Sequence, residues 1–166
     1  MSMTHYMELL ADNQPWNLIL FMAIPVILAE TVAITELFIL YSRQYHGGVR
    51  NINRIASIIG GIYFTGVFIY LMANAVIPLT VNRGWRGAAD VIAVLSYLAG
   101  IVPLLGMALL DMGLIGKKLD AEGKLKLHAI FVALFLVVAH IAMIFGMLDP
   151  SLLMSGNSSS MGHMQH

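Results

Sequence analysis

Six ionisable side chains fall inside long apolar stretches of the sequence: Glu30, Glu36, Asp90, Asp111, His128 and His140. A charged group in the middle of a lipid bilayer costs several kcal/mol unless it faces a protein interior and finds a partner there. Burial makes a carboxylate hold its proton more tightly and an imidazole hold it less tightly, so a buried pair can exchange one proton near neutral pH. These residue types therefore predict proton handling first and transition-metal binding second.

Helical geometry separates the candidate residues into two groups. Glu30 and Glu36 are six residues apart, which at 100° per residue places them about 120° apart around a helix, and the same holds for His128 and His140. The spacing predicts two polar layers, the first formed by Glu30, His140 and Asn74 and the second by Glu36, Asp111 and His128. We expect Glu30 and His140 to face the bundle interior and to interact directly or through one water.

Asp90 falls in the first turn of a predicted helix, where a carboxylate is stabilised by the helix dipole, so we assign it to the membrane interface. Haem b would need axial histidines. His128 and His140 lie roughly 18 Å apart along one helix and cannot share an iron. A haem within one chain would therefore pair His128 with His46, and otherwise it needs a histidine from a partner chain.

The two tails carry a separate signal, because thioether and imidazole groups together suit Cu(I). The candidate copper ligands are His5, Met161, His163, Met164 and His166. Composition predicts that residues 149–166 form a flexible tail. The chain contains no cysteine, which excludes disulfides, thiolate zinc sites and iron–sulfur clusters.

Composition places these residues in a membrane protein. Of the 166 residues 59% are hydrophobic and 11% are charged, and the net charge is zero, which excludes a soluble domain and a nucleic-acid-binding surface. Four apolar blocks, at about 16–41, 55–79, 88–115 and 127–148, are each near or above the twenty residues that cross a bilayer. We predict an all-α integral membrane protein with residues 1–166 as one domain, its four helices packed up-down-up-down because the loops are short.

Basic residues predict the orientation of these four helices. The loops after the first and third blocks carry seven Lys and Arg residues, whereas the middle loop carries two. Since short basic loops stay in the cytoplasm, we expect both termini to be extracytoplasmic, in a multi-pass protein of a bacterial-type inner (plasma) membrane.

Glycines and prolines indicate how the helices pack. Ala56 with Gly60, and Ser57 with Gly61, are small residues four apart that allow close helix contact and offer a surface for a homo-oligomer or a larger membrane complex. Gly66, Gly100 and Gly106 extend the same pattern. Pro25 and Pro103 are expected to bend the first and third helices.

The function predicted from these features is proton or transition-metal handling, with copper as the candidate metal, by transport or relay. One alternative is a subunit of a respiratory complex that holds haem b or contacts quinone, and a second is an accessory protein without chemistry. The sequence contains no phosphate-binding loop, nucleophile elbow or metalloprotease motif, so it gives no support for an autonomous enzyme.

Overall fold

The computed structural model describes residues 4–43 and 46–149, and its regular secondary structure there is entirely helical. The prediction of an all-α fold with four membrane-crossing helices is confirmed. The spans are Trp16–Ser42, Gly48–Val81, Ala88–Asp111 and Ala121–Met147, each long and apolar enough to cross a bilayer. The second and fourth begin before the predicted apolar blocks, because their polar first turns are also helical. The third ends at Asp111, just before Gly113 at φ 74°.

Each of the first three spans is divided into shorter helical segments, and a short helix precedes the first. The elements in chain order are α1 (His5–Ala11), α2 (Trp16–Leu18), η1 (Ile19–Ala23), α3 (Ile24–Ser42), α4 (Gly48–Leu71), η2 (Met72–Val76), α5 (Ile77–Val81), α6 (Ala88–Ala99), α7 (Ile101–Asp111) and α8 (Ala121–Met147).

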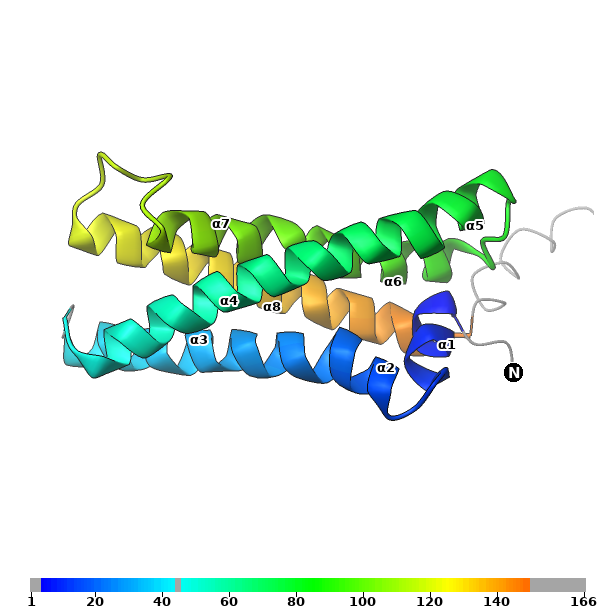
Figure 1. Ribbon diagram of the computed structural model, residues 1–166, viewed down its shortest axis with the longest axis horizontal. Coiled ribbons are helices and arrows are strands. Elements are labelled where there is room, and N and C mark those ends of the chain that lie inside the picture. The colour runs from blue at the N-terminus through cyan, green and yellow to red at the C-terminus, as the bar shows by residue number, and fades with distance from the viewer. Residues whose placement is uncertain (1–3, 44–45, 150–166) are drawn as a thin grey trace, which may run out of the picture.

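The spans form a closed ring in which each packs against its neighbours in sequence. Helix α3 contacts α4, α4 contacts α7, α6 and α7 contact α8, and α8 returns to α3. Figure 1 shows the resulting bundle, with consecutive spans running in opposite directions. We call the end formed by the α3–α4 and α7–α8 connections the basic end, and the opposite end, where α1 and α5 lie, the α1 end.

Prolines explain where the spans are interrupted. Two π-helical turns, η1 and η2, come directly before segments that carry Pro25 and Pro78 in their first turn. Proline cannot donate a hydrogen bond to the carbonyl four residues earlier, and its ring crowds that carbonyl. The backbone hydrogen bonds of the preceding turn therefore join residues five apart instead of four. Pro25 cannot donate to the carbonyl of Phe21. That carbonyl accepts a hydrogen bond from the Tyr97 hydroxyl instead. The third span is interrupted at Gly100, shortly before Pro103.

Close packing depends on a few glycines. A Cβ on Gly61 would collide with the Cβ of Ala108 and lie 2.9 Å from the carbonyl oxygen of Leu104, so α4 and α7 touch through this position. Gly100 and Gly106 lie against aromatic rings of neighbouring helices. Gly66 has nothing within 4 Å of such a Cβ, so within this chain the small-residue pattern does not extend to it.

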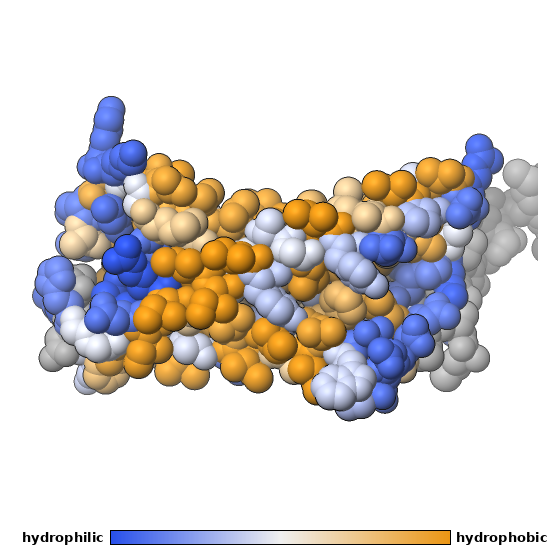
Figure 2. All heavy atoms as spheres, viewed as in Figure 1, coloured by the Kyte–Doolittle hydropathy of each residue, from blue (hydrophilic) through white to orange (hydrophobic). Residues whose placement is uncertain are grey.

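The surface of the bundle is apolar between two polar ends. In Figure 2 hydrophobic residues cover most of the middle of the visible face, and hydrophilic residues gather at both ends. Large apolar side chains such as Ile34, Leu37 and Ile62 are more than 60% exposed. The protein is therefore a multi-pass membrane protein whose outer surface suits a lipid bilayer.

Candidate functional site

His128 is one of the fully buried polar side chains of the bundle, and it lies between two carboxylates. It comes from α8 and is fully buried. Its Nε2 lies 3.0 Å from Oδ2 of Asp111 at the end of α7, and its Nδ1 lies 2.8 Å from Oε2 of Glu36 on α3. Glu36 is 2% exposed and Asp111 is 7% exposed. The structure thus brings together all three residues expected in the second layer, from three different spans.

Asp111 is the most heavily bonded carboxylate of this group. Besides His128, it accepts a hydrogen bond at 2.7 Å from Nη2 of Arg50 and another from the hydroxyl of Ser57, both on α4. A guanidinium and a hydroxyl donor both favour the ionised carboxylate over the protonated one. Asp111 is therefore held as an anion that fixes the orientation of the imidazole.

Glu36 is less completely satisfied. Its Oε2 accepts a hydrogen bond at 3.1 Å from Nδ2 of Asn53, whose Oδ1 accepts from Nη1 of Arg50 at 2.8 Å. Nδ1 of His128 lies within ion-pair distance of the same oxygen, but the two groups are not aligned for a hydrogen bond. The other oxygen of Glu36 has no partner among the residues that the structure describes. Buried polar atoms are usually paired. The unpaired oxygen of Glu36 is therefore an acceptor that can still bind a proton.

The cluster is open towards one end of the bundle and closed towards the other. A crevice of about 490 Å³ at the basic end reaches Arg50 and Asp111. On the opposite side lies an apolar layer of buried residues, among them Val32, Met107 and Val132, each four residues along its helix from a cluster member. Phe64 of α4 packs into the same layer. Water can therefore approach the cluster from the basic end, while side chains of all four spans close the other side.

The first predicted layer has a different form. Glu30 and His140 both line a cavity of about 230 Å³, yet both side chains are exposed, and the structure shows no hydrogen bond between them. Nδ1 of His140 lies 2.6 Å from the carbonyl oxygen of Leu136, one turn earlier on α8. The sequence predicts that Glu30 and His140 interact in the bundle interior, whereas the structure places both at an exposed cavity. The physical reason is that α3 and α8 are the least closely packed neighbours in the ring, so the cavity between them opens at the bundle surface.

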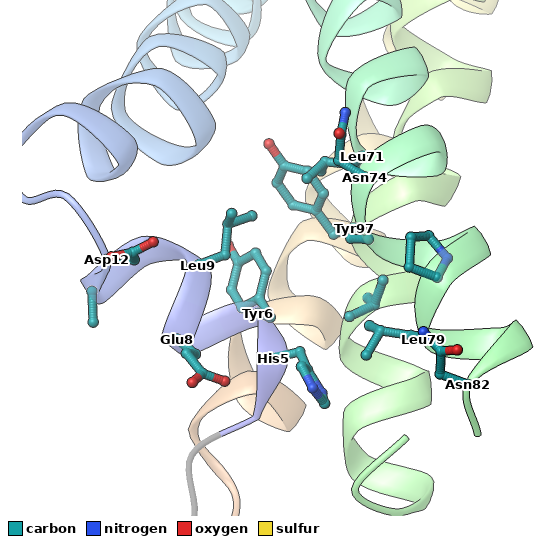
Figure 3. A pocket seen from close by; sticks show the side chains of 14 residues that line it. His5, Tyr6, Glu8, Leu9, Asp12, Leu71, Asn74, Leu79, Asn82 and Tyr97 are labelled. Atoms are coloured by element: carbon teal, nitrogen blue, oxygen red, sulfur yellow. The ribbon is translucent and has the colours of Figure 1, made fainter. Parts of the chain in front are cut away.

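Asn74 does not belong to that layer. Its Nδ2 donates a hydrogen bond at 2.9 Å to the carbonyl oxygen of Tyr70, and it lines a separate cavity of about 680 Å³ at the α1 end. Figure 3 shows this cavity between α1 and the end of the second span, with Asn74 and Asn82 on the side opposite His5 and Glu8. Asn74, in the π-helical turn η2, therefore lies at a different cavity from Glu30 and His140.

Asp90 lies in the first turn of α6, as expected, where it is fully buried and contacts His5 of α1. Its Oδ1 accepts the backbone N–H of His5 at 2.6 Å, and its Oδ2 lies 2.5 Å from Nδ1 of the same residue. Glu8 adds a second link to the 82–87 connection through an ion pair at 2.6 Å with Arg86. These contacts give His5 a partner other than the copper expected from the sequence.

Packing and a cap complete the attachment of α1. The Thr4 hydroxyl accepts the N–H of Met7 as an N-cap and donates at 2.7 Å to the carbonyl oxygen of Gly146 on α8. The ring of Tyr6 lies where a side chain on Gly146 would be. Burial raises the pKa of Tyr6 to about 12, so this phenol stays neutral at physiological pH.

The proposed metal and haem ligands are only partly within the structure. In residues 4–43 and 46–149 no three His, Asp or Glu side chains are arranged to hold a metal ion. The remaining expected copper ligands, Met161, His163, Met164 and His166, lie outside those residues. Both ring nitrogens of His128 face carboxylates, which leaves neither free for the iron of a haem shared with His46.

Comparison with known proteins places this architecture in a family. Residues 1–163 match the family of unknown function DUF6803. The chain belongs to that family. No curated protein and no solved structure matches it.

In this DUF6803 protein, sequence reasoning missed three residues of the buried cluster. The charge pattern identifies Arg50 only as a basic loop residue, the small-residue pattern identifies Ser57 only as a packing residue, and neither pattern includes Asn53. One signal was available: Arg50, Asn53 and Ser57 recur at intervals of three and four, which places them on one face of a helix. A polar stripe of this kind at the start of an apolar span indicates a buried partner.

Proposed function

We propose that this DUF6803 protein handles protons through the cluster of Glu36, His128, Asp111 and Arg50. The observation that carries the proposal is the contact of 2.8 Å between Nδ1 of His128 and Oε2 of Glu36 in a site with almost no solvent exposure. Two basic groups this close in a dry environment are favourable only when one of them carries a proton. The contact is therefore a place where one proton can be held.

The residues of the cluster have different roles in holding the proton. Asp111, which accepts hydrogen bonds from Arg50 and Ser57, accepts the Nε2–H of His128 and so leaves Nδ1 on the side of Glu36. The proton then resides on Nδ1 or on Oε2, and the second oxygen of Glu36 is free to receive or release one. Asp111 and Arg50 act as positioning residues, whereas Glu36 and His128 carry the proton.

The apolar layer gives this exchange a direction. The crevice at the basic end reaches the cluster, whereas Val32, Phe64, Met107 and Val132 separate it from the cavity that holds Glu30 and His140. Movement of a proton to the second cavity requires this layer to open. A polar site that is accessible from one side and closed by an apolar layer on the other corresponds to one of the two states that alternating access requires.

Proton flux measured on reconstituted protein tests this proposal. The full chain is placed in liposomes with a pH-sensitive dye inside and a potassium gradient with valinomycin to drive proton movement. We expect Glu36→Gln to lower the flux at least tenfold, because the amide keeps the shape but cannot take up the proton. The matched control is Glu122→Gln, at an exposed carboxylate on α8 that pairs only with Lys126 at the surface among the described residues. Absence of flux in the wild type, or equal flux in Glu36→Gln and wild type, would overturn the proposal.

A second candidate function is contact with a lipid-soluble quinone, favoured by the cavity of Glu30 and His140. Five aromatic residues line it, namely Tyr6, Phe21, Phe64, Tyr97 and Phe135. Its volume of about 230 Å³ exceeds the roughly 150 Å³ of a protein cavity that accommodates benzene. A ring could lie among these side chains with its oxygens towards the two polar groups.

Binding of a short-chain quinone to the purified protein, measured by calorimetry, tests the second candidate. Ala139→Leu would fill the cavity and is expected to abolish binding, whereas Ala133→Leu on the exposed face of α8 leaves the cavity intact. Equal binding by both variants would place the quinone elsewhere.

A further inference from the structure

The crevice at the basic end is lined by an excess of cationic side chains. Arg50 and Arg54 come from α4, and Lys124 comes from α8; the imidazole of His46, which precedes α4, also lines the crevice. Asp111 is the one carboxylate that lines the crevice within the described part of the chain. Side chains from two spans thus direct positive charge into one concavity, which is a stronger arrangement than basic residues scattered along a membrane surface.

The negative charge of Asp111 is already matched within the cluster. Arg50, Ser57 and His128 all bond to its two oxygens, so it neither pairs with Arg54 and Lys124 nor strongly repels an incoming anion. Within the described residues, Arg54 and Lys124 have no ion-pair partner. Lys124 is also a half-buried residue. The crevice therefore has unmatched positive charge.

The backbone at the same place adds hydrogen-bond donors. Helix α4 begins at Gly48, has no side-chain cap, and follows Gly47 at φ 127°. A Cβ on Gly47 or Gly48 would meet nothing within 4 Å, so a ligand atom can approach the free N–H groups of the first turn. The N-terminus of a helix carries partial positive charge, which favours an anion beside Arg54 and Lys124.

We propose that this crevice binds a phosphate group. A phosphate offers several acceptor oxygens for donors that arrive from different directions, and the volume of about 490 Å³ leaves room for a group attached to it. The phosphate belongs either to the headgroup of an anionic lipid or to a free ion, because the crevice lies at the end of the spans where headgroups gather. This site goes beyond the proposed proton function and does not depend on it.

Binding to the full chain in detergent tests the proposal with two probes. Inorganic phosphate is measured by equilibrium dialysis with labelled phosphate, and phosphatidylglycerol by native mass spectrometry against phosphatidylcholine. We expect Arg54→Ala and Lys124→Ala each to weaken binding of the relevant probe about fivefold or more. The matched control is Lys118→Ala, which removes a charge from the same end but outside the crevice, and it should change binding less than twofold.

The two probes distinguish the source of the phosphate. Retention of phosphatidylglycerol but not of inorganic phosphate supports a lipid headgroup, and the reverse supports a free ion. Absence of binding by both probes, or an equal loss in Lys118→Ala and Lys124→Ala, would overturn the proposal. Thermal unfolding of each variant shows that its fold is intact. Glu36→Gln is expected to retain phosphate binding within twofold, so failure of the proton proposal and failure of this one give different results.

Discussion

Each end of the third span holds an aspartate that meets a histidine, but the two pairs do different things. Asp111 and His128 belong to two membrane-crossing helices, and their contact also involves Arg50, Ser57 and Glu36. Asp90 and His5 join a span to the seven-residue helix α1. The same two residue types therefore form a shared buried network in one place and a local attachment in the other.

The difference lies in what must move when each pair separates. Asp111 and His128 lie on α7 and α8, which pack against each other, so displacement of either helix would expose the core of the bundle. Parting Asp90 from His5 requires only that α1 leave the end of the bundle. A helix of seven residues is not stable in isolation, so α1 depends on these contacts for its structure. Residue types alone thus do not decide whether a histidine–aspartate pair is structural; the attached elements do.

The largest expected effect comes from removing each aspartate. Asp111→Ala leaves Arg50 and His128 without their shared acceptor and should lower the free energy of unfolding by about 3–5 kcal/mol. Asp90→Ala removes acceptors from α1 and its surroundings and should cost about 1–3 kcal/mol, mostly by releasing α1. Reversible unfolding in mixed micelles measures both values. Equal losses would contradict the distinction between network and attachment.

Substitutions at three glycines test the same comparison through packing. Gly61→Ala drives a methyl group into α7 and should cost about 1–3 kcal/mol of bundle stability. Gly146→Ala places its methyl group 2.7 Å from the ring of Tyr6 and should displace α1 alone. Gly66→Ala, where nothing lies near, should raise stability by about 0.5–1 kcal/mol through helix propensity. If Gly146→Ala destabilised the bundle as much as Gly61→Ala, α1 would be part of the core.

Removal of one side chain of the attachment should have a local effect. His5→Ala loses the side-chain contact with Asp90 but keeps the backbone hydrogen bond to it. We expect hydrogen exchange of the α1 amides to accelerate about tenfold, while exchange in α8 stays unchanged. Faster exchange near His128 in this variant would show that the two ends of the bundle are coupled.

The smallest expected effect is at the exposed pair of Glu122 and Lys126. The two side chains are more than half exposed and lie one turn apart on α8, so Glu122→Gln should change stability by less than about 0.5 kcal/mol. Thermal unfolding in the same detergent measures this value. A loss as large as that of Asp111→Ala would mean that charge at the basic end, rather than burial, stabilises the cluster.

Much of the architecture could be predicted because it depends on long runs of one property. The length and apolar character of the four spans are readable residue by residue, and short loops leave little choice of topology. Glu36, Asp111 and His128 could be placed at one level because the rise per residue fixes depth along a helix. Depth does not fix rotation, however, so the same reasoning groups Asn74 with Glu30 and His140, although it lines a different cavity.

The sequence by itself therefore determined that the chain crosses a membrane four times and which ionisable residues cannot face lipid without cost. The tertiary structure decided which of them meet: His128 lies between Glu36 and Asp111, Arg50 joins them from α4, and α1 returns to Asp90. The physical reason is that hydrophobicity and helical rise are properties of each segment alone. Helix rotation, proline-induced changes in register and contacts between distant segments depend on how all four spans pack together.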